Sequence, residues 1–66
     1  METLGEALPK EIERVQEIIK LYESIPNGHF AASLMRADIQ NAQQAMMEGN
    51  LPLMLAIYQD LKEWKE

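Results

Sequence analysis

The chain has 66 residues, with 11 acidic and 6 basic side chains, one histidine and no cysteine, and 47% of its residues are hydrophobic. This length allows one small domain, and a core of this size supplies only about 3 to 5 kcal/mol of net stability. The composition excludes disulfides and cysteine-based zinc sites, which leaves self-association as the common means of adding stability. It also excludes intrinsic disorder, because the apolar content is high and the net charge of −5 is modest.

Helical periodicity runs through three segments, which two short breaker clusters separate. We therefore predict one all-α domain over residues 1–66, a compact three-helix domain made of a helical hairpin plus one helix. The helices are expected at about 9–25, 28–48 and 51–65. No segment has the alternating pattern of a strand, and the isoleucines recur at helical spacing.

The first helix is expected to start at Pro9, because a first-turn proline lacks only an N–H that has no partner there. Pro26 and Asn27 are expected to end it, with Asn27 capping the second helix. Its apolar side chains recur at spacings of three and four, which places them on one face: Ile12, Val15, Ile19 and Tyr22.

The second helix is expected to end at Gly49 in the left-handed conformation, and Asn50 to cap the third helix. At about 100° per residue, one arc of the second helix is apolar, with Leu34 and Ala45 on its flank and with Ala31, Met35, Ile39, Ala42 and Met46 near its centre. One side of the third helix collects Met54, Ile57, Tyr58, Leu61 and Trp64.

The expected core gathers residues from all three stripes: Ile12, Val15, Ile19, Met35, Ile39, Ala42, Met46, Met54, Ile57 and Leu61. The stripes are wide enough to leave apolar surface uncovered in a monomer, notably at Leu53, Leu55, Trp64 and Met47. We therefore expect the chain to form a homo-oligomer, most simply a helical dimer.

Catalytic chemistry finds little support in the sequence. His29 is the only imidazole, and neither Ser24 nor Ser33 lies in a Gly-x-Ser-x-Gly motif. Gly28 and Gly49 are each explained by a helix boundary, so no glycine-rich phosphate loop is indicated. We expect a protein that is not an enzyme, with no catalytic residue, no metal ligand and no cofactor.

Asp38 falls inside the apolar arc of the second helix, where an unpaired charge is expensive to bury. One interpretation is an ion pair or hydrogen bond with Arg14, Arg36 or a tyrosine hydroxyl at the rim of the bundle. The other is that Asp38 lines a pocket or an oligomer interface, where its charge sets specificity.

The outer face of the second helix has no charged residue between Asp38 and Glu48. Uncharged amides lose less on desolvation than Lys or Glu, and methionine adapts its shape to a partner. An ordinary solvated face is the alternative reading. The predicted partner-binding residues on this face are Gln40, Gln43, Gln44 and Met47.

Nucleic-acid and membrane binding are not indicated. The six basic residues are scattered among eleven acids, so no basic stripe forms. No run approaches the roughly 20 apolar residues of a membrane span, and residues 1–8 lack a signal pattern. The expected location is the cytoplasm.

Residues 30–63, FAASLMRADIQNAQQAMMEGNLPLMLAIYQDLKE, resemble the small helical accessory proteins that bacteriophages and prophages encode. The resemblance covers about half of the chain and includes no catalytic motif. It implies a binding role directed at a host protein, or the sequestering of a small signalling molecule such as a cyclic nucleotide.

Two functions therefore remain open from the sequence. The first is a non-enzymatic protein-interaction module with an unidentified protein partner, which docks on the amide-rich second helix or on a groove between subunits. The alternative is a small-ligand binder, which needs basic, acidic and aromatic side chains to converge. The candidates for that site are Arg36, Asp38, Arg14 and Phe30, with Tyr22 as a further aromatic.

Overall fold

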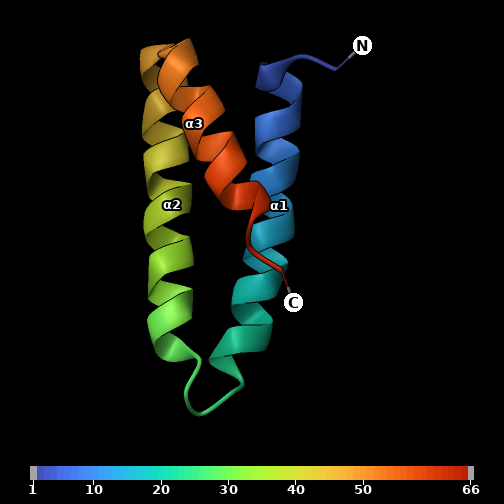
Figure 1. The fold of residues 1–66 in the computed structure, drawn as a ribbon, viewed down its shortest axis with the longest axis vertical. Coiled ribbons are helices and arrows are strands. Elements are labelled where there is room, and N and C mark those ends of the chain that lie inside the picture. Colours follow the sequence, from blue (N-terminus) through green and yellow to red (C-terminus); the bar gives the residue numbers. More distant parts are fainter. Residues whose placement is uncertain (1, 66) are drawn as a thin grey trace.

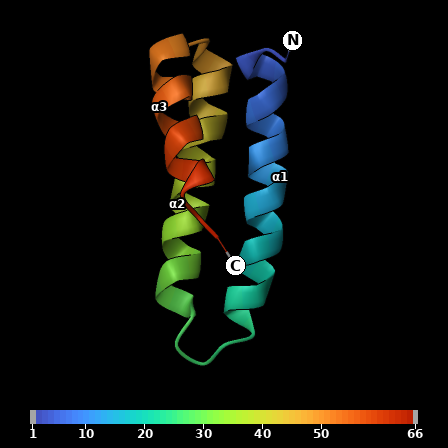
Figure 2. The ribbon, with the colours of Figure 1, turned by 45° about the vertical axis from the view of Figure 1, so that its right-hand side comes forward.

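The computed structural model describes residues 2–65 and contains three α-helices: α1 (Leu4–Glu23), α2 (His29–Glu48) and α3 (Leu51–Lys62). The two 20-residue helices α1 and α2 form an antiparallel hairpin, and the shorter α3 lies across one face of it (Figure 1). A view turned by 45° shows α3 starting beside the C-terminal end of α2, at the end of the molecule opposite the α1–α2 loop (Figure 2). Residues 2–65 include no strand, and the predicted all-α three-helix domain is confirmed.

Helix α1 begins at Leu4, so the predicted start at Pro9 is wrong, and Pro9 lies inside the helix. Proline has no N–H to donate to the carbonyl of Gly5, which weakens the turn that precedes it. The packing of two leucines stabilises this turn: Leu8 is fully buried, and Leu4 packs against the core. The apolar contacts of the first turns therefore extend the helix past a residue that usually marks its start.

The loop between α1 and α2 differs from the expected one in its capping residue. Gly28, and not Asn27, is the residue that precedes α2, and no side chain caps the helix there. Gly28 is buried, and a Cβ at this position would clash with the backbone carbonyl oxygen of Tyr22. The glycine therefore allows the loop to pass close to the last turns of α1.

The corner between α2 and α3 has the predicted geometry. Gly49 has φ of 65°, the left-handed conformation, and its N–H bonds the carbonyl of Met46 at 3.2 Å. The N–H of Asn50 bonds the carbonyl of Ala45 at 3.1 Å, and its side-chain Oδ1 accepts from the N–H of Leu53 at 3.2 Å. These bonds satisfy the last carbonyls of α2 and a first-turn amide of α3.

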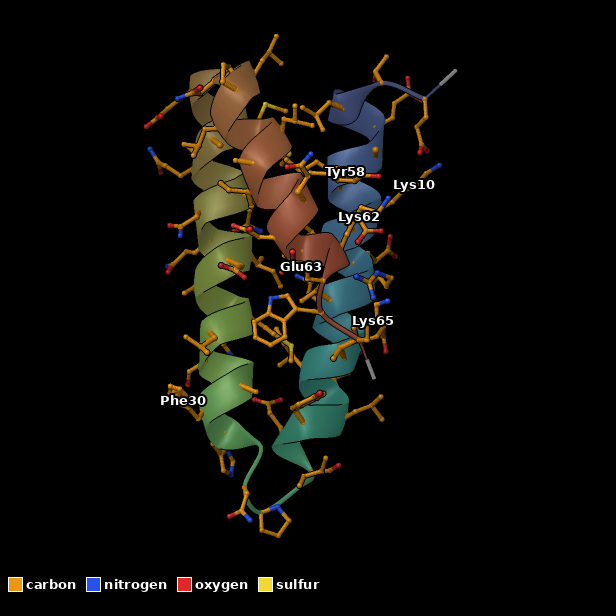
Figure 3. All side chains as sticks on the ribbon, in the orientation of Figure 1. Lys10, Phe30, Tyr58, Lys62, Glu63 and Lys65 are labelled. Carbon is orange, nitrogen blue, oxygen red and sulfur yellow. The ribbon has the colours of Figure 1, made fainter. Side chains whose placement is uncertain are left out.

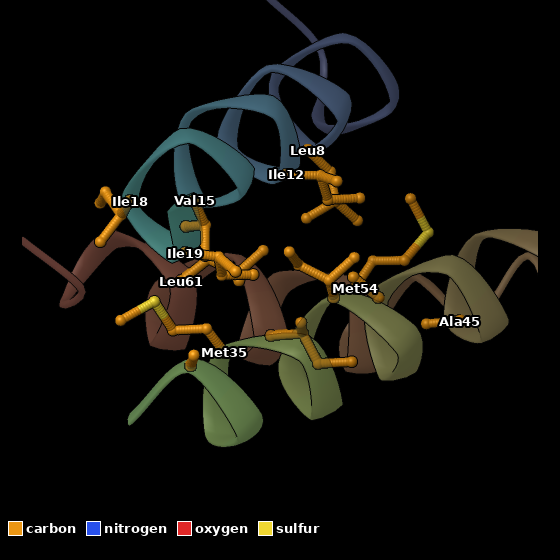
Figure 4. Packing of buried hydrophobic residues seen from close by; sticks show 13 residues of the cluster. Leu8, Ile12, Val15, Ile18, Ile19, Met35, Ala45, Met54 and Leu61 are labelled. Atoms are coloured by element: carbon orange, nitrogen blue, oxygen red, sulfur yellow. The ribbon is translucent and has the colours of Figure 1, made fainter. Parts of the chain in front are cut away.

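The core lies between the three helices, where the buried side chains of each helix point toward those of the others (Figure 4). The predicted core is confirmed except for Met46, which is only half-buried. The buried arc of α2 is as wide as the predicted one but is turned toward Ala32, which is fully buried, whereas Ala31 is only half-buried and Leu34 is exposed. The buried set is Leu8, Ile12, Val15, Ile18, Ile19, Ala32, Met35, Ile39, Ala42, Ala45, Met54, Ile57 and Leu61.

Helix α3 ends at Lys62, three residues before the predicted end, and residues 63–65 continue along the hairpin. Figure 3 labels Glu63 and Lys65 in this segment, with Lys65 lying over α1. The hydroxyl of Tyr22 donates to the carbonyl of Lys65 at 3.2 Å. The expectation that Trp64 stays uncovered is wrong, because Trp64 is half-buried against the core.

Several ion pairs lie on the surface of the hairpin. Lys10, labelled in Figure 3, pairs with Glu2, and the hydrogen bond and negative charge of Glu2 raise the pKa of Lys10 above its ordinary value. Lys20 pairs with Glu17 at 3.1 Å on one helix. Water screens such exposed pairs, so they add little to the stability that the core provides.

Candidate functional site

A groove runs between α1 and α2, with a volume of about 650 Å³. The groove opens on the side of the hairpin away from α3. Asp38 marks the α3 side of α2, because it contacts the C-terminal segment that follows α3. Arg36, which lines the groove, points about 200° around α2 from Asp38. Its lining consists of Gln16, Glu17, Ile19, Lys20 and Glu23 from α1, and of Arg36, Ile39, Gln40 and Gln43 from α2.

The floor of the groove is apolar and its walls carry amides. Ile19 and Ile39 are almost fully buried, one on each helix, and close the bottom. Gln16 on α1 faces Gln40 and Gln43 on α2 across the opening. An entering apolar side chain would contact the isoleucines, while the amides can both donate and accept hydrogen bonds to a partner backbone.

Charged residues lie toward the loop end of the groove and balance one another. Arg36 on α2 forms an ion pair with Glu23 on α1, which bridges the two helices. Lys20 and Glu17 form the second pair in the lining, on α1 alone. Two cations and two anions leave this part of the groove without net charge, so it attracts neither acidic nor basic ligands over long distances.

Three of the four predicted partner-binding residues lie on one stripe of α2. Gln40, Gln43 and Met47 are spaced by three and four residues, and the first two line the groove. Met47 extends the stripe beyond the groove and is 82% exposed. Gln44 borders this stripe one turn after Gln40, lies outside the groove lining, and donates a hydrogen bond of 2.8 Å to Glu48. The structure therefore joins Gln40, Gln43 and Met47 into one surface and leaves Gln44 beside it.

The hydrogen-bond partner of Asp38 is not among the three that its place in the sequence suggests. Its Oδ2 accepts a hydrogen bond of 2.8 Å from the indole Nε1–H of Trp64. Arg36 pairs elsewhere, and Arg14 donates to Glu11 and to backbone carbonyls. The interpretation of Asp38 as a rim residue with a hydrogen-bond partner therefore gives the right kind of contact with the wrong partner.

A smaller hollow of about 290 Å³ surrounds this hydrogen bond, lined by Asp38, Asp60, Glu63 and Trp64. Three of its four lining residues are acidic. An anionic ligand such as a nucleotide phosphate would meet like charges here, which disfavours its binding. This hollow therefore does not supply the phosphate-binding part of the small-ligand hypothesis.

Arg14 anchors the C-terminal end of α3. Its Nη2 donates to the carbonyl of Leu61 at 2.8 Å, and its Nη1 donates to the carbonyl of Trp64 at 2.9 Å. Its Nε–H donates to Glu11 at 3.1 Å, which holds the guanidinium in place. A cation at the last carbonyls of a helix is favourable because the helix dipole is negative there. The donors of Arg14 are thus engaged in holding the fold.

The four candidates for small-ligand binding do not converge within one chain. Arg36 lies in the groove, whereas Asp38 and Arg14 lie on the side that α3 covers. Phe30 is 69% exposed on the outer side of α2, near the loop (Figure 3). Only an assembly of several chains could bring these side chains together.

Two residues that matter for these surfaces have roles that the sequence pattern does not predict. Gln16 completes the amide walls of the groove. The sequence gives only one indication of this role, which is that Gln16 is uncharged although it lies between Glu13 and Glu17 on the polar side of α1. Trp64 is half-buried where the sequence pattern predicts an exposed residue. Its indole N–H was a usable signal, because a buried tryptophan usually finds a hydrogen-bond acceptor.

In the part of the chain that the structure describes, no group of three or more His, Cys, Asp and Glu side chains is arranged to hold a metal ion. Over the same residues, no helix combines the length and the apolar character needed to cross a membrane. Comparison with known proteins identifies no relative: no family model, no curated protein and no solved structure matches this chain.

Proposed function

We propose that this chain is a non-enzymatic protein-interaction module that binds a protein partner along the α1–α2 groove. The observation that carries the proposal is the combination of an apolar floor at Ile19 and Ile39 with amide walls at Gln16, Gln40 and Gln43. A protein interface typically has an apolar centre and a rim that exchanges hydrogen bonds, and this groove offers both.

The shape of the groove suggests the form of the partner. A channel between two antiparallel helices accepts a third helix, whose apolar side chains at spacings of three and four enter the channel. Met47 continues the surface toward the end of α2, where its flexible side chain adapts to the partner. The partner segment is therefore an amphipathic helix with few charges on its buried face.

We also propose that the chain self-associates, most simply as a dimer. Large apolar side chains remain exposed at both ends of the molecule, and for a chain of 66 residues an added interface supplies stability that the core lacks. The resemblance of residues 30–63 to small phage accessory proteins supports a host protein as the partner. Self-association and partner binding use different faces in this proposal, so one does not block the other.

The test is a paired substitution in the groove stripe, Gln43→Glu with Met47→Lys. Both side chains are exposed, so folding is retained, while a charge is placed at each of two positions that a partner must desolvate. The matched control is Ser33→Glu with Asn41→Lys, which adds the same charges to exposed positions of α2 outside the groove lining. A tagged wild-type chain and the control should capture the same partner from host lysate, and the groove variant should lose it.

The alternative, a small-ligand binder, has one supporting observation, which is that Arg36 and Lys20 both line the 650 Å³ groove. An anionic ligand would have to displace Glu23 and Glu17, their present partners. A nucleotide and metabolite screen by thermal unfolding separates the two functions, because a bound small molecule raises the melting temperature of the purified chain.

A further inference from the structure

Methionines are the side chains of this chain that a peroxide oxidises most readily. The chain has five methionines and no cysteine, so no thiol competes for the oxidant. How fast a methionine reacts depends on how far solvent reaches its sulfur. The structure describes four of the five, and these four differ widely in exposure.

Three of the four described methionines are protected by the core. Met35 is fully buried and Met54 is 6% exposed, and both side chains lie between the helices (Figure 4). Met46 is half-buried and packs against the same core. An oxygen added to one of these sulfurs would have to enter close-packed apolar surroundings, so the folded chain resists their oxidation.

Met47 differs from its neighbour Met46 in the direction in which it points. Successive residues of a helix project about 100° apart around the axis, which turns Met47 from the core toward solvent. Its side chain is 82% exposed, the highest value among the large apolar side chains of residues 2–65. An oxidant therefore reaches its sulfur without any movement of the fold.

Met47 also belongs to the surface through which the chain is proposed to bind its partner. It continues the stripe of Gln40 and Gln43, one turn beyond the residues that line the groove. A thioether at this place loses little on desolvation and adapts its shape to the partner. A sulfoxide is polar and chiral, and its oxygen is costly to desolvate in an interface unless the partner supplies a donor.

We propose that Met47 is an oxidation site of this chain and that its sulfoxide weakens the binding of the protein partner along the α1–α2 groove. The inference rests on the proposed function and names a way in which that binding is controlled. In the oxidation step, the sulfur of Met47 attacks one oxygen of hydrogen peroxide, an S–O bond forms, the O–O bond breaks, and water leaves. The sulfur gives up the two electrons that the peroxide gains. Methionine sulfoxide reductases reverse the change.

Oxidation of Met47 should leave the fold intact. Its side chain stands outside the core. Backbone bonds from the N–H groups of Gly49 and Asn50 hold the last turn of α2, and they do not involve the side chain of Met47. The effect on binding can therefore be measured without a change in stability.

Timed treatment of the purified chain with hydrogen peroxide tests the site. Mass spectrometry of proteolytic fragments locates each added oxygen, and fragmentation of the peptides separates Met47 from Met46. We expect Met47 to react at least about tenfold faster than Met35 and Met54, and faster than Met46, with an unchanged circular dichroism spectrum. In urea that unfolds the chain, the four rates should become similar. Oxidation of Met46 or Met54 as fast as Met47 in the folded chain would overturn the assignment.

Capture of the partner from host lysate tests the control of binding. The chain is oxidised first, catalase removes the peroxide, and the lysate is desalted so that sulfoxide reductases lack their reductant. The oxidised wild type should capture about tenfold less of the partner than the untreated chain. Met47→Leu keeps an apolar side chain without sulfur, so it should capture the partner equally before and after the treatment. Met47→Gln carries a polar group without any oxidant and should capture as little as the oxidised wild type.

The outcomes separate this inference from the proposed function. If the untreated wild type captures no partner, the proposed function fails and the control of binding fails with it, while the oxidation rates still decide whether Met47 is the site. If untreated and oxidised wild type capture the same protein equally well, the proposed function stands and the control by Met47 is wrong. A Met47→Leu chain that loses the partner on oxidation also overturns it, because another side chain is then responsible.

Discussion

The indole Nε1–H of Trp64 donates a 2.8 Å hydrogen bond to Oδ2 of Asp38, which ties the segment after α3 to the middle of α2. The two residues are 26 positions apart in sequence, and both are half-buried. Together with Arg14 and Tyr22, they hold residues 63–65 against the hairpin. Residues 63–65 thus continue beyond the short third helix without being helical, and they cover part of the core.

Loss of this hydrogen bond should destabilise the fold measurably. In Asp38→Ala the indole N–H of Trp64 loses its acceptor, and we expect the free energy of unfolding to fall by about 1 to 2 kcal/mol. Asp38→Asn keeps a side-chain oxygen and should lose less. Asp60→Asn is the control, because Asp60 lines the same hollow without bonding to Trp64. Urea unfolding followed by circular dichroism measures all three, and equal stability of Asp38→Ala and wild type would refute the role of the bond.

Trp64 is the only tryptophan, so its fluorescence reports on the C-terminal segment without interference. Arg14→Met keeps most of the aliphatic stem but removes the donors to Leu61 and Trp64. We expect about 1 kcal/mol of lost stability and a red shift of the tryptophan emission as the segment loosens. Arg14→Lys, which retains a cation near the end of α3, should shift the emission less. An emission spectrum that Arg14→Met leaves unchanged would contradict the anchoring.

The two glycines at the helix boundaries should respond to substitution for different reasons. Gly49 has φ of 65° and no atom near the place of a Cβ, so Gly49→Val should lose about 1 to 2 kcal/mol through backbone strain alone. Gly49→Asn should lose less, because asparagine tolerates this conformation. Thermal unfolding ranks the two variants, and an unchanged melting temperature for Gly49→Val would argue against the corner.

At Gly28 the backbone conformation suits any residue, but a Cβ would clash with the carbonyl oxygen of Tyr22. Gly28→Ala and Gly28→Asn should therefore destabilise the fold alike, since asparagine has no advantage where the obstacle is space. The same thermal unfolding series measures this pair. A rescue by asparagine at Gly28 would show that the loop conformation differs from the one described.

Replacement of Pro9 should stabilise the protein. Pro9→Ala restores an N–H that can bond the carbonyl of Gly5 and removes a residue that is unfavourable inside a helix. We expect a gain of about 1 to 2 kcal/mol in unfolding free energy, reduced by the greater freedom of the unfolded chain. Chemical denaturation measures the gain. A loss of stability would indicate that the helix begins at Pro9, as the sequence alone suggests.

The local parts of the fold were predictable because neighbouring residues determine them. The corner at Gly49 and Asn50 needs only a left-handed glycine and a capping side chain, and both were recognised. The start of α1 was missed because it depends on Leu8 and Leu4 packing against distant residues, which outweighs the effect of Pro9. The half-burial of Met46 was missed because Met46 points toward the core but lies in the last turn of α2, where its burial depends on how far the other helices extend past that end.

The surface features differ in the same way: those carried by one helix were predictable, and those that depend on contacts between helices were not. The amide stripe of Gln40, Gln43 and Met47 was visible in the sequence because one helix carries it. Gln16, which faces the stripe from α1, could be assigned only once the hairpin placed the two helices side by side. The bond between Asp38 and Trp64 also joins distant elements, and no spacing rule within one helix predicts it.

Site-specific photo-crosslinking shows whether a protein partner occupies the α1–α2 groove. The chain has no cysteine, so single cysteines at Gln40 or Gln43 can each carry a benzophenone maleimide. Asn41→Cys is the control, because Asn41 is exposed on α2 outside the groove lining and points about 100° around the helix from Gln40. In host lysate, we expect both groove positions to crosslink to one and the same protein and position 41 not to do so. Crosslinking to that protein from position 41 alone, or equally from all three positions, would show that the partner does not bind in the groove.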